Sequence, residues 1–340
     1  MEEIRLIRAA EPPESLARTR PSNRPPFRIA AVQHRWHADP EEHEAALAEG
    51  VRLAAGEGAK LVCLQELTLS RYFAVDPGGP QAAGAEPEDL PGGRTFEFAS
   101  RMAQEHGFHV HASLYERAEG DDGLGFNTAI VVSPKGELVA RTRKLHIPIT
   151  AGYYEDKYFR PGPGDSEAFP LVPLDPELHQ LDHPADSQVD AVRERVHLGL
   201  PTCWDQWFPE VARAYSLEGA EVLIYPTAIG SEPDHPEFDT QPLWQHVIVG
   251  NGIANGVFMV AINRLGTEAP LTFYGSSFIS DPYGRILAQA PREEPAVLVA
   301  DLDLDQRRDW LELFPFLTTR RPDTYARLAE QATEVMQDGD

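Results

Sequence analysis

The chain of 340 residues carries 54 acidic and 30 basic side chains, a formal net charge of −24, and 42% of its residues are apolar. This acidity argues against nucleic-acid binding, because phosphate contacts need a basic surface. With only two cysteines we expect no disulfide framework and a reducing, cytoplasmic location. The N-terminus lacks the apolar core of a signal peptide, and no stretch reaches the apolar length of a membrane-spanning helix, so no membrane partner is expected.

The first half of the chain alternates between strand and helix patterns. Residues 1–26, rich in Pro, Arg and Glu, predict a flexible N-terminal arm. Beyond them, alternating apolar runs and helical spacing set the elements, and Gly, Pro and Asp clusters separate them. In chain order we predict a buried strand over 27–36, a helix over 39–59, a strand over 60–67, a loop over 76–94, a helix over 94–107 and a strand over 108–117.

Hairpins join the pattern in the second half. The turn at 133–136 connects two strands within 126–147, and an acidic stretch over about 172–195 without firm periodicity predicts an exposed insertion. The remaining predicted elements are strands over 195–203, 221–227, 257–264, 276–290 and 296–304, and helices over 208–220, 242–256 and 320–336. We therefore expect an α/β sandwich with a mixed sheet over 27–305, and a helical tail over 306–340 at a subunit interface.

Three chemically distinct side chains each follow an apolar strand. Glu66 ends "LVCLQEL", Lys144 ends "ELVARTRK" and Cys203 ends "HLGLPTC". Strand ends at the rim of an α/β sheet are where binding sites are commonly built. A carboxylate, an ammonium and a thiol suit acyl transfer, because the first can accept the thiol proton and the second can compensate the oxyanion.

Each of these residues also has a simpler interpretation. A glutamate at a strand end is usually a surface residue, and Lys144 lies in a basic run that could be solvated. Cys63, inside an apolar strand, predicts core packing, which is also the common role of a free cysteine such as Cys203. The histidines show no trustworthy metal-ligand spacing. The residue types alone leave both interpretations open.

The same three stretches resemble the Glu-Lys-Cys motifs of the nitrilase (carbon–nitrogen hydrolase) superfamily, namely Glu66 in "LQEL", Lys144 in "RKLHIP" and Cys203 in "CWDQWFPE". The resemblance extends over about residues 27–325. Within the superfamily the chain looks most like the N-carbamoylputrescine amidohydrolases, on "GYYEDKYFRPG", "GAEVLIYPTAIGSEP", "NRLG" and "TFYGSSFISDP".

The resemblance implies a four-layer αββα sandwich, a homo-oligomer of two or more subunits, a small-molecule ureido substrate and no metal or organic cofactor. It implies that Glu155 is a second glutamate near Lys144 and that the Trp204 backbone N–H donates to the oxyanion. It also implies that Thr227 lines the pocket. The chain departs from the family pattern at 201–202, where Pro-Thr precedes the cysteine and predicts an unpaired strand end, and in the length of the acidic insertion.

The positions after the cysteine bear on the substrate. Relatives that act on N-carbamoyl amino acids place arginine there, whereas this chain has Gln206 and Trp207. Trp207 could face a protonated amine, and an acid such as Asp205, Glu210 or Glu232 could pair with it. This pattern favours a substrate that ends in an amine, and the resemblance implies N-carbamoylputrescine, hydrolysed to putrescine, carbon dioxide and ammonia. Two alternatives stay open: an enzyme similar to β-ureidopropionase or another N-carbamoyl amino acid hydrolase, and a catalytically silent binding module.

Overall fold

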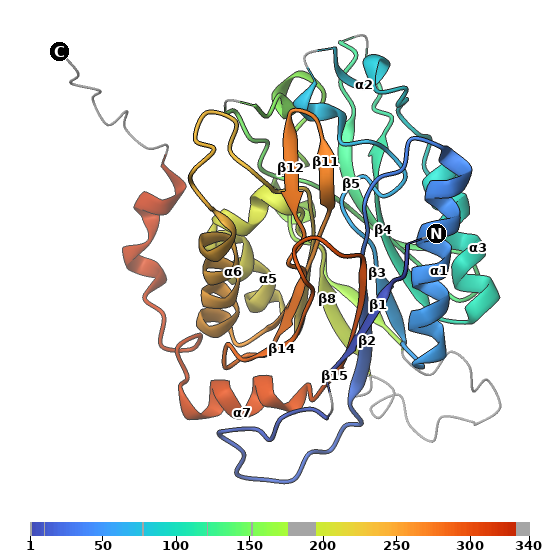
Figure 1. Ribbon diagram of the computed structural model, residues 1–340. Coiled ribbons are helices and arrows are strands. Elements are labelled where there is room, and N and C mark those ends of the chain that lie inside the picture. Colours follow the sequence, from blue (N-terminus) through green and yellow to red (C-terminus); the bar gives the residue numbers. More distant parts are fainter. Residues whose placement is uncertain are drawn as a thin grey trace.

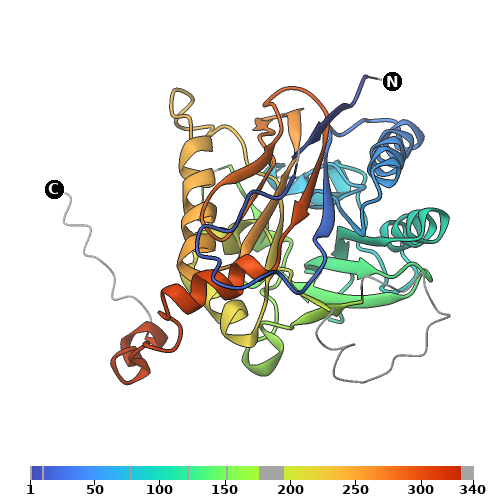
Figure 2. The same cartoon turned by 90° about the horizontal axis from the view of Figure 1, so that it is seen from below.

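The computed structural model describes residues 2–9, 11–76, 78–120, 122–150, 152–175 and 195–330. Its elements form four layers, with two β-sheets face to face at the centre and a pair of helices on the outer side of each sheet (Figure 1). Seen from below, the two helix pairs lie at opposite sides of the paired sheets (Figure 2). The predicted αββα sandwich is confirmed.

The first sheet has seven strands and mixes parallel and antiparallel pairs. Strands β2, β3 and β4 run parallel to one another. β15 pairs antiparallel with β2 and parallel with β1, and β5 and β6 pair antiparallel with their neighbours. The spatial order is β1 (Arg5–Arg8), β15 (Ala296–Leu302), β2 (Phe27–Gln33), β3 (Leu61–Cys63), β4 (His109–Glu116), β5 (Phe126–Val132) and β6 (Leu138–Arg143).

The second sheet has six strands, of which β8, β9 and β10 are parallel. The spatial order is β14 (Ile286–Gln289), β13 (Phe278–Ser280), β10 (Phe258–Asn263), β9 (Val222–Thr227), β8 (Val196–Gly199) and β7 (Val172–Leu174). A separate hairpin of β11 (Leu265–Glu268) and β12 (Leu271–Tyr274) follows β10 directly.

Helices cover the outer face of each sheet. α1 (Pro40–Gly56) and α3 (Arg94–His106) pack on the first sheet, and α5 (Pro209–Glu218) and α6 (Gln241–Asn255) pack on the second. The remaining helices are the short α2 (Gly79–Ala82), α7 (Asp305–Leu313) and the 3₁₀ turns η1 (Phe73–Val75), η2 (Glu155–Lys157), η3 (Asp165–Glu167), η4 (Cys203–Trp207), η5 (Pro322–Thr324) and η6 (Ala326–Ala329).

The alternation of side chains along each strand explains the layers. In β2, Ile29 and Ala31 join the core between the sheets, whereas Ala30 and Val32 pack against α1 and α3. Because successive side chains point to opposite faces, a strand buried on both faces must be apolar throughout. Cys63 lies in the core between the sheets, as predicted for a packing residue.

The N-terminal segment differs from the prediction. Residues 1–26 were expected to form a flexible arm, but β1 pairs in parallel with β15 at the edge of the first sheet. Further along, Arg18 forms ion pairs with Asp303 and Asp309. The composition of the segment resembles a linker, but its pairing partners lie almost 300 positions away in the sequence, so a local pattern does not reveal them.

Two other boundaries are corrected by the structure. The start of the predicted acidic insertion forms β7, which pairs with β8, while residues 176–194 lie outside the described residues. The predicted loop over 76–94 contains α2, and the described part of the predicted helix over 320–336 forms η5 and η6.

No helix in the described ranges is long and apolar enough to span a membrane. The expected homo-oligomer, tail interface and cytoplasmic location stay predictions.

Acidification tests the burial of His111, which sits opposite Cys63 and Val131 in the first sheet. Burial lowers its pKa to about 3, so the folded protein keeps the ring neutral while the unfolded chain binds a proton below about pH 6.5. Its stabilising contribution is therefore complete above that pH and decreases as the pH falls toward 3, by up to about 1.4 kcal/mol per pH unit.

We expect His111→Phe to flatten this pH dependence. In urea denaturation at about pH 6.5 and about pH 5, the wild type should lose about 1–2 kcal/mol more than the variant. His246→Phe, at an exposed position of α6, is the matched control and should keep the wild-type slope. Equal slopes for the wild type and His111→Phe would contradict the assignment.

Candidate active site

Glu66, Lys144 and Cys203 converge from both sheets. Glu66 follows β3 and Lys144 directly follows β6, both in the first sheet, whereas Cys203 begins η4 after β8 of the second sheet. β8 ends at Gly199, before the Pro-Thr pair, which agrees with the unpaired strand end expected there. The charges of Glu66 and Lys144 act on the Cys203 thiol, so the three side chains lie near one another although they follow strands of two different sheets.

Lys144 is the centre of a buried charged cluster. Its Nζ lies 3.2 Å from Glu66 Oε1 and donates to Glu155 Oε1 and Oε2 at 2.8 and 2.7 Å. All three side chains are 0% exposed. An ammonium between two carboxylates leaves a net negative charge in a site without water contact, and such clusters are stable only when hydrogen bonds complete them.

Two neutral side chains complete the cluster. Asn127 Nδ2 donates to Glu66 Oε1 at 2.7 Å, and the Tyr72 hydroxyl donates to Glu155 Oε1. Glu66 Oε2, in contrast, is buried without a hydrogen-bond partner among the described residues. Since buried polar atoms are normally paired, a single free carboxylate oxygen beside a thiol has the position of a proton acceptor.

Cys203 has an unusual backbone for its residue type. Its φ of 42° lies in the left-handed region, which costs about 1–3 kcal/mol for a residue other than glycine and is often found at functional sites. Burial raises the pKa of its thiol, the charge of Glu66 raises it further and that of Lys144 lowers it. The thiol is therefore protonated at rest and needs a nearby base to become a nucleophile.

The charged cluster also shifts the pKa values of its own members. Burial alone lowers the pKa of Lys144, but the charges of Glu155 and Glu66 outweigh it and raise the value above the usual range. Burial raises the pKa of Glu155, and Lys144 only partly offsets this effect. The two carboxylates therefore favour the charged form of Lys144.

Asp205 connects the two loops that carry Lys144 and Cys203. It accepts hydrogen bonds from the backbone N–H of Thr202 at 3.0 Å and of His146 at 3.0 Å. The His146 ring nitrogen Nδ1 lies 2.8 Å from the same carboxylate, and the ring stacks on Phe208 with centroids 3.7 Å apart. Asp205 thus fixes the loop of Cys203 relative to the loop of Lys144. Because its carboxylate already accepts these hydrogen bonds, it is not available to a substrate.

A cavity of about 330 Å³ opens onto Cys203 and Glu155. Tyr153 also lines the cavity. Burial raises the pKa of its hydroxyl, and the charges of Glu232 and Cys203 raise this pKa further. The lining is otherwise mainly aromatic and aliphatic: Tyr72, Pro148, Thr150, Trp204, Trp207, Ala228, Ile229, His235, Phe238, Thr240 and Leu243.

The structure separates the other predicted site residues. Trp204 and Trp207 line the cavity, as expected. The prediction for Thr227 is wrong, because its hydroxyl donates to Ile262 O at 3.1 Å inside the protein while the following residues, Ala228 and Ile229, form the wall.

The acids proposed to pair with a substrate amine also lie in different places. Glu232 lines the cavity, Glu210 is exposed outside it, and Asp205 is already engaged. Gln206 accepts a hydrogen bond from Trp244 Nε1 at 2.9 Å and so anchors η4 to α6. Only Glu232 of the three acids is therefore positioned to meet a bound substrate.

Sequence reasoning did not identify Tyr72 and Asn127. Asn127 had a detectable signal, since it is a polar residue at the start of the apolar strand "FNTAIVV". Tyr72 had none, because its role depends on a hydrogen bond to a residue 83 positions away. In the described part of the chain, no group of three or more His, Cys, Asp and Glu side chains could hold a metal ion.

Comparison with known proteins agrees with this geometry. Residues 28–312 match the carbon–nitrogen hydrolase family. The chain is 35% identical over 305 residues to the N-carbamoylputrescine amidase of Solanum lycopersicum, covering 87% of this chain and 93% of that protein. It is 33% identical to the citrullinase of Francisella tularensis, covering 90% and 99%.

A solved structure shows the same fold at similar identity. The carbon–nitrogen hydrolase from Helicobacter pylori G27 superposes with a TM-score of 0.71 at 32% identity, over 90% of this chain and 99% of that one. The chain therefore belongs to the carbon–nitrogen hydrolase family of the nitrilase superfamily. It is a hydrolase of non-peptide C–N bonds. The names of its relatives support hydrolysis of the C–N bonds of carbamoyl groups.

Removing the Lys144 charge tests the charged cluster without reference to activity. Lys144→Met would leave the carboxylates of Glu66 and Glu155 buried together, which should lower the free energy of unfolding by about 3–5 kcal/mol. The loss should be smaller at acidic pH, because one carboxyl can then take up a proton. Urea denaturation near pH 8 and near pH 5 measures both effects.

Two controls belong to this experiment. Lys157→Met, at an exposed lysine, should change stability by less than about 0.5 kcal/mol. Adding Glu155→Gln to Lys144→Met should recover part of the loss. A loss below about 1 kcal/mol that does not depend on pH would show that the three charges are not coupled as described.

Proposed function

We propose that the protein hydrolyses N-carbamoylputrescine to putrescine, carbon dioxide and ammonia, with Cys203 as nucleophile. The observation that carries this proposal is the pairing of two features in one cavity. A thiol with an adjacent buried cluster of Glu66, Lys144 and Glu155 supports acyl transfer from a ureido carbon, and Glu232 in the same lining supports recognition of a protonated amine.

In the first half of the reaction, Glu66 Oε2 accepts the Cys203 proton as the sulfur attacks the ureido carbon. Negative charge develops on the carbonyl oxygen, and Lys144 Nζ together with the Trp204 backbone N–H would stabilise it. Glu66 then gives its proton to the departing amine, and a carbamoyl group remains bonded to the sulfur. Glu155 and Tyr72 hold Lys144 in place throughout.

In the second half, Glu66 removes a proton from water, which attacks the carbamoyl thioester carbon. The tetrahedral intermediate collapses, the sulfur leaves and recovers its proton, and the carbamic acid breaks down to carbon dioxide and the second amine. The net reaction is R–NH–CO–NH₂ + H₂O → R–NH₂ + CO₂ + NH₃. Each proton removed by Glu66 is returned to a leaving group, so the base is regenerated.

Glu232 supports the choice of an amine-ended substrate. Burial raises the pKa of its carboxyl, and a hydrogen bond with Thr240 and the nearby His235 only partly offset this effect. Among the described residues that line the cavity, none is arginine or lysine. A carboxylate on the substrate would therefore meet Glu232 without a guanidinium or ammonium to pair with, whereas an ammonium would find an acid and aromatic faces.

A ureido amino acid is the second candidate substrate, and His235 favours it. This histidine lines the cavity beside Glu232 and could pair, when protonated, with a substrate carboxylate. The relative named citrullinase is consistent with that possibility. A catalytically silent binding module is the least supported alternative, because the complete charged cluster and the free Glu66 oxygen have no purpose in a passive scaffold.

Ammonia release from a panel of ureido compounds tests the substrate assignment. We expect N-carbamoylputrescine to give a higher kcat/KM than N-carbamoyl-β-alanine or citrulline. Glu232→Gln should raise KM for N-carbamoylputrescine about tenfold to a hundredfold, because a charge-assisted contact is lost, with kcat nearly unchanged.

The matched control is Glu210→Gln, which removes an acid from the same region of the chain outside the cavity. It should leave both kinetic constants within about twofold of the wild type. Preference for N-carbamoyl-β-alanine, or an unchanged KM in Glu232→Gln, would reject the assignment to N-carbamoylputrescine.

A further inference from the structure

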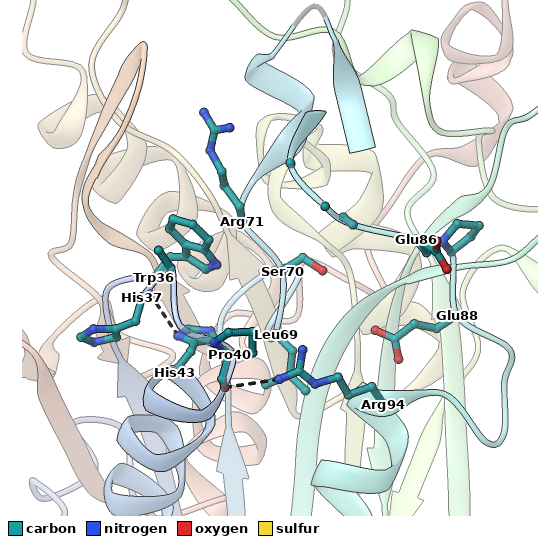
Figure 3. Close-up of a pocket in the computed structure, with 15 residues that line it drawn as sticks. Trp36, His37, Pro40, His43, Leu69, Ser70, Arg71, Glu86, Glu88 and Arg94 are labelled. Carbon is teal, nitrogen blue, oxygen red and sulfur yellow. Dashed lines mark hydrogen bonds between the residues drawn. The ribbon is translucent and has the colours of Figure 1, made fainter. Parts of the chain in front are cut away.

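The segment from Glu66 to Tyr72 determines where both carboxylates lie. It carries Glu66 at its start, and at its end the Tyr72 hydroxyl donates to Glu155. Part of its outer side is open, because Leu69, Ser70 and Arg71 border a second cavity of about 560 Å³ (Figure 3). On that side Leu69 packs in the core beneath the helices and His43 Nε2 lies 2.9 Å from the Thr68 carbonyl oxygen, so the two ends of the segment rely on contacts from the inner side.

Most polar groups around this second cavity are already paired with other protein groups, so few are left to bind a ligand. Arg71 pairs with Asp76, Arg94 pairs with Glu44, and Glu88 accepts hydrogen bonds from the backbone and hydroxyl of Thr95. The cavity matters because it leaves part of the segment from Glu66 to Tyr72 without neighbouring side chains. A segment with open space on one side depends on directional bonds from the other side to keep its position.

Arg264 provides those bonds from the inner side. Its guanidinium is fully buried and donates from Nη1 to the carbonyls of Glu66 at 2.9 Å and Leu67 at 3.2 Å. Nη2 donates to the carbonyl of Ser70 at 2.9 Å. The planar fork of an arginine can bind several carbonyls at once, which a lysine cannot reproduce.

Glu268 completes the arrangement. It accepts from Arg264 Nε at 2.8 Å, and its other carboxylate oxygen accepts from the backbone N–H of Tyr72 at 2.7 Å. Arg264 directly precedes β11 and Glu268 ends it, so the two residues flank one short strand of the β11–β12 hairpin. The Arg264–Glu268 ion pair therefore forms hydrogen bonds with both ends of the segment, through Arg264 at Glu66 and through Glu268 at Tyr72.

The backbone of Leu67 shows why such a grip is needed. Its φ of 47° is in the left-handed region, a conformation that persists in a residue of this type only when the surroundings enforce it. The Leu67 N–H donates to Ser113 Oγ at 3.1 Å on one side, and Arg264 holds the carbonyl on the other. The turn next to Glu66 is thus stabilised by hydrogen bonds from Ser113 on one side and from Arg264 on the other.

We propose that Arg264 and Glu268 form a positioning pair that sets the Glu66 carboxylate, and through Tyr72 the Glu155 carboxylate, for the reaction at Cys203. Both act through the backbone of the segment that carries Glu66 and Tyr72, so they are positioning residues and not catalytic residues. The proposal rests on the proposed role of Glu66 as the base. It requires that loss of the pair lowers kcat while substrate binding is retained.

The test uses Arg264→Lys and Glu268→Gln, which keep approximate size and remove the fork or the negative charge. Arg307→Lys is the matched control, since Arg307 is also largely buried and donates to the carbonyls of Ser216 and Asn255, far from the cluster along a different helix. For each protein, kcat, KM and the melting temperature are measured by ammonia release and thermal unfolding. The substrate is whichever member of the ureido panel the wild type hydrolyses best.

We expect Arg264→Lys to lower kcat by between about tenfold and about a hundredfold, the effect of a small displacement of a reacting group, with KM within about twofold. Glu268→Gln should show the same split and decides the question if Arg264→Lys does not fold. Arg307→Lys should lower the melting temperature to a similar extent and keep kcat within about twofold.

Two outcomes would overturn the proposal. One is a folded Arg264→Lys or Glu268→Gln variant with wild-type kcat, and the other is an equal loss of kcat in Arg307→Lys, which would mean that general destabilisation explains the effect. A wild type that hydrolyses another ureido compound but not N-carbamoylputrescine would reject the substrate assignment alone and leave this comparison intact.

Discussion

The structure depends on one interaction, the burial of the Lys144 ammonium between the carboxylates of Glu66 and Glu155. Removing an isolated charge from water costs several kcal/mol, and even a paired charge is stable only with good geometry and completed hydrogen bonds. Asn127 and Tyr72 supply those hydrogen bonds, and one oxygen of Glu66 has no hydrogen-bond partner among the described residues. The same arrangement that stabilises the cluster therefore also leaves the carboxylate oxygen that the proposed mechanism uses as the base for Cys203.

The four-layer fold makes this arrangement possible. Glu66 and Lys144 follow strands of the first sheet and Cys203 follows a strand of the second, so the thiol meets the charged cluster only when the apolar inner faces of both sheets pack together. Asp205 then links the loops of Lys144 and Cys203, and Arg264, between β10 and β11, reaches across to the segment that carries Glu66. Each connection joins residues distant in sequence, which couples the integrity of the site to the packing of the whole domain.

The sequence predicted what local pattern can encode. Apolar strands followed by Glu66, Lys144 and Cys203 pointed to a shared site, and the helices over α1, α3, α5 and α6 followed from their spacing and from flanking Gly and Pro. The errors arose where long-range contacts decide the outcome. The N-terminal segment looks like a linker but adds an edge strand to β15, and Thr227 faces the interior because of its register in β9. Arg264 lay in the recognised "NRLG" motif, yet its contacts with Glu66 and Ser70 could be found only in three dimensions.

The central claim is that Glu66 acts as the base for Cys203, and selective alkylation tests it most directly. Brief treatment with iodoacetamide near neutral pH, followed by peptide mass spectrometry, compares Cys203 with Cys63, a second buried cysteine whose thiol pKa is raised by burial and which lies beside no carboxylate of the charged cluster. We predict rapid modification of Cys203 alone, slowed about a hundredfold by Glu66→Gln. Modification of Cys203 no faster than that of Cys63, or an unchanged rate in Glu66→Gln, would contradict the account.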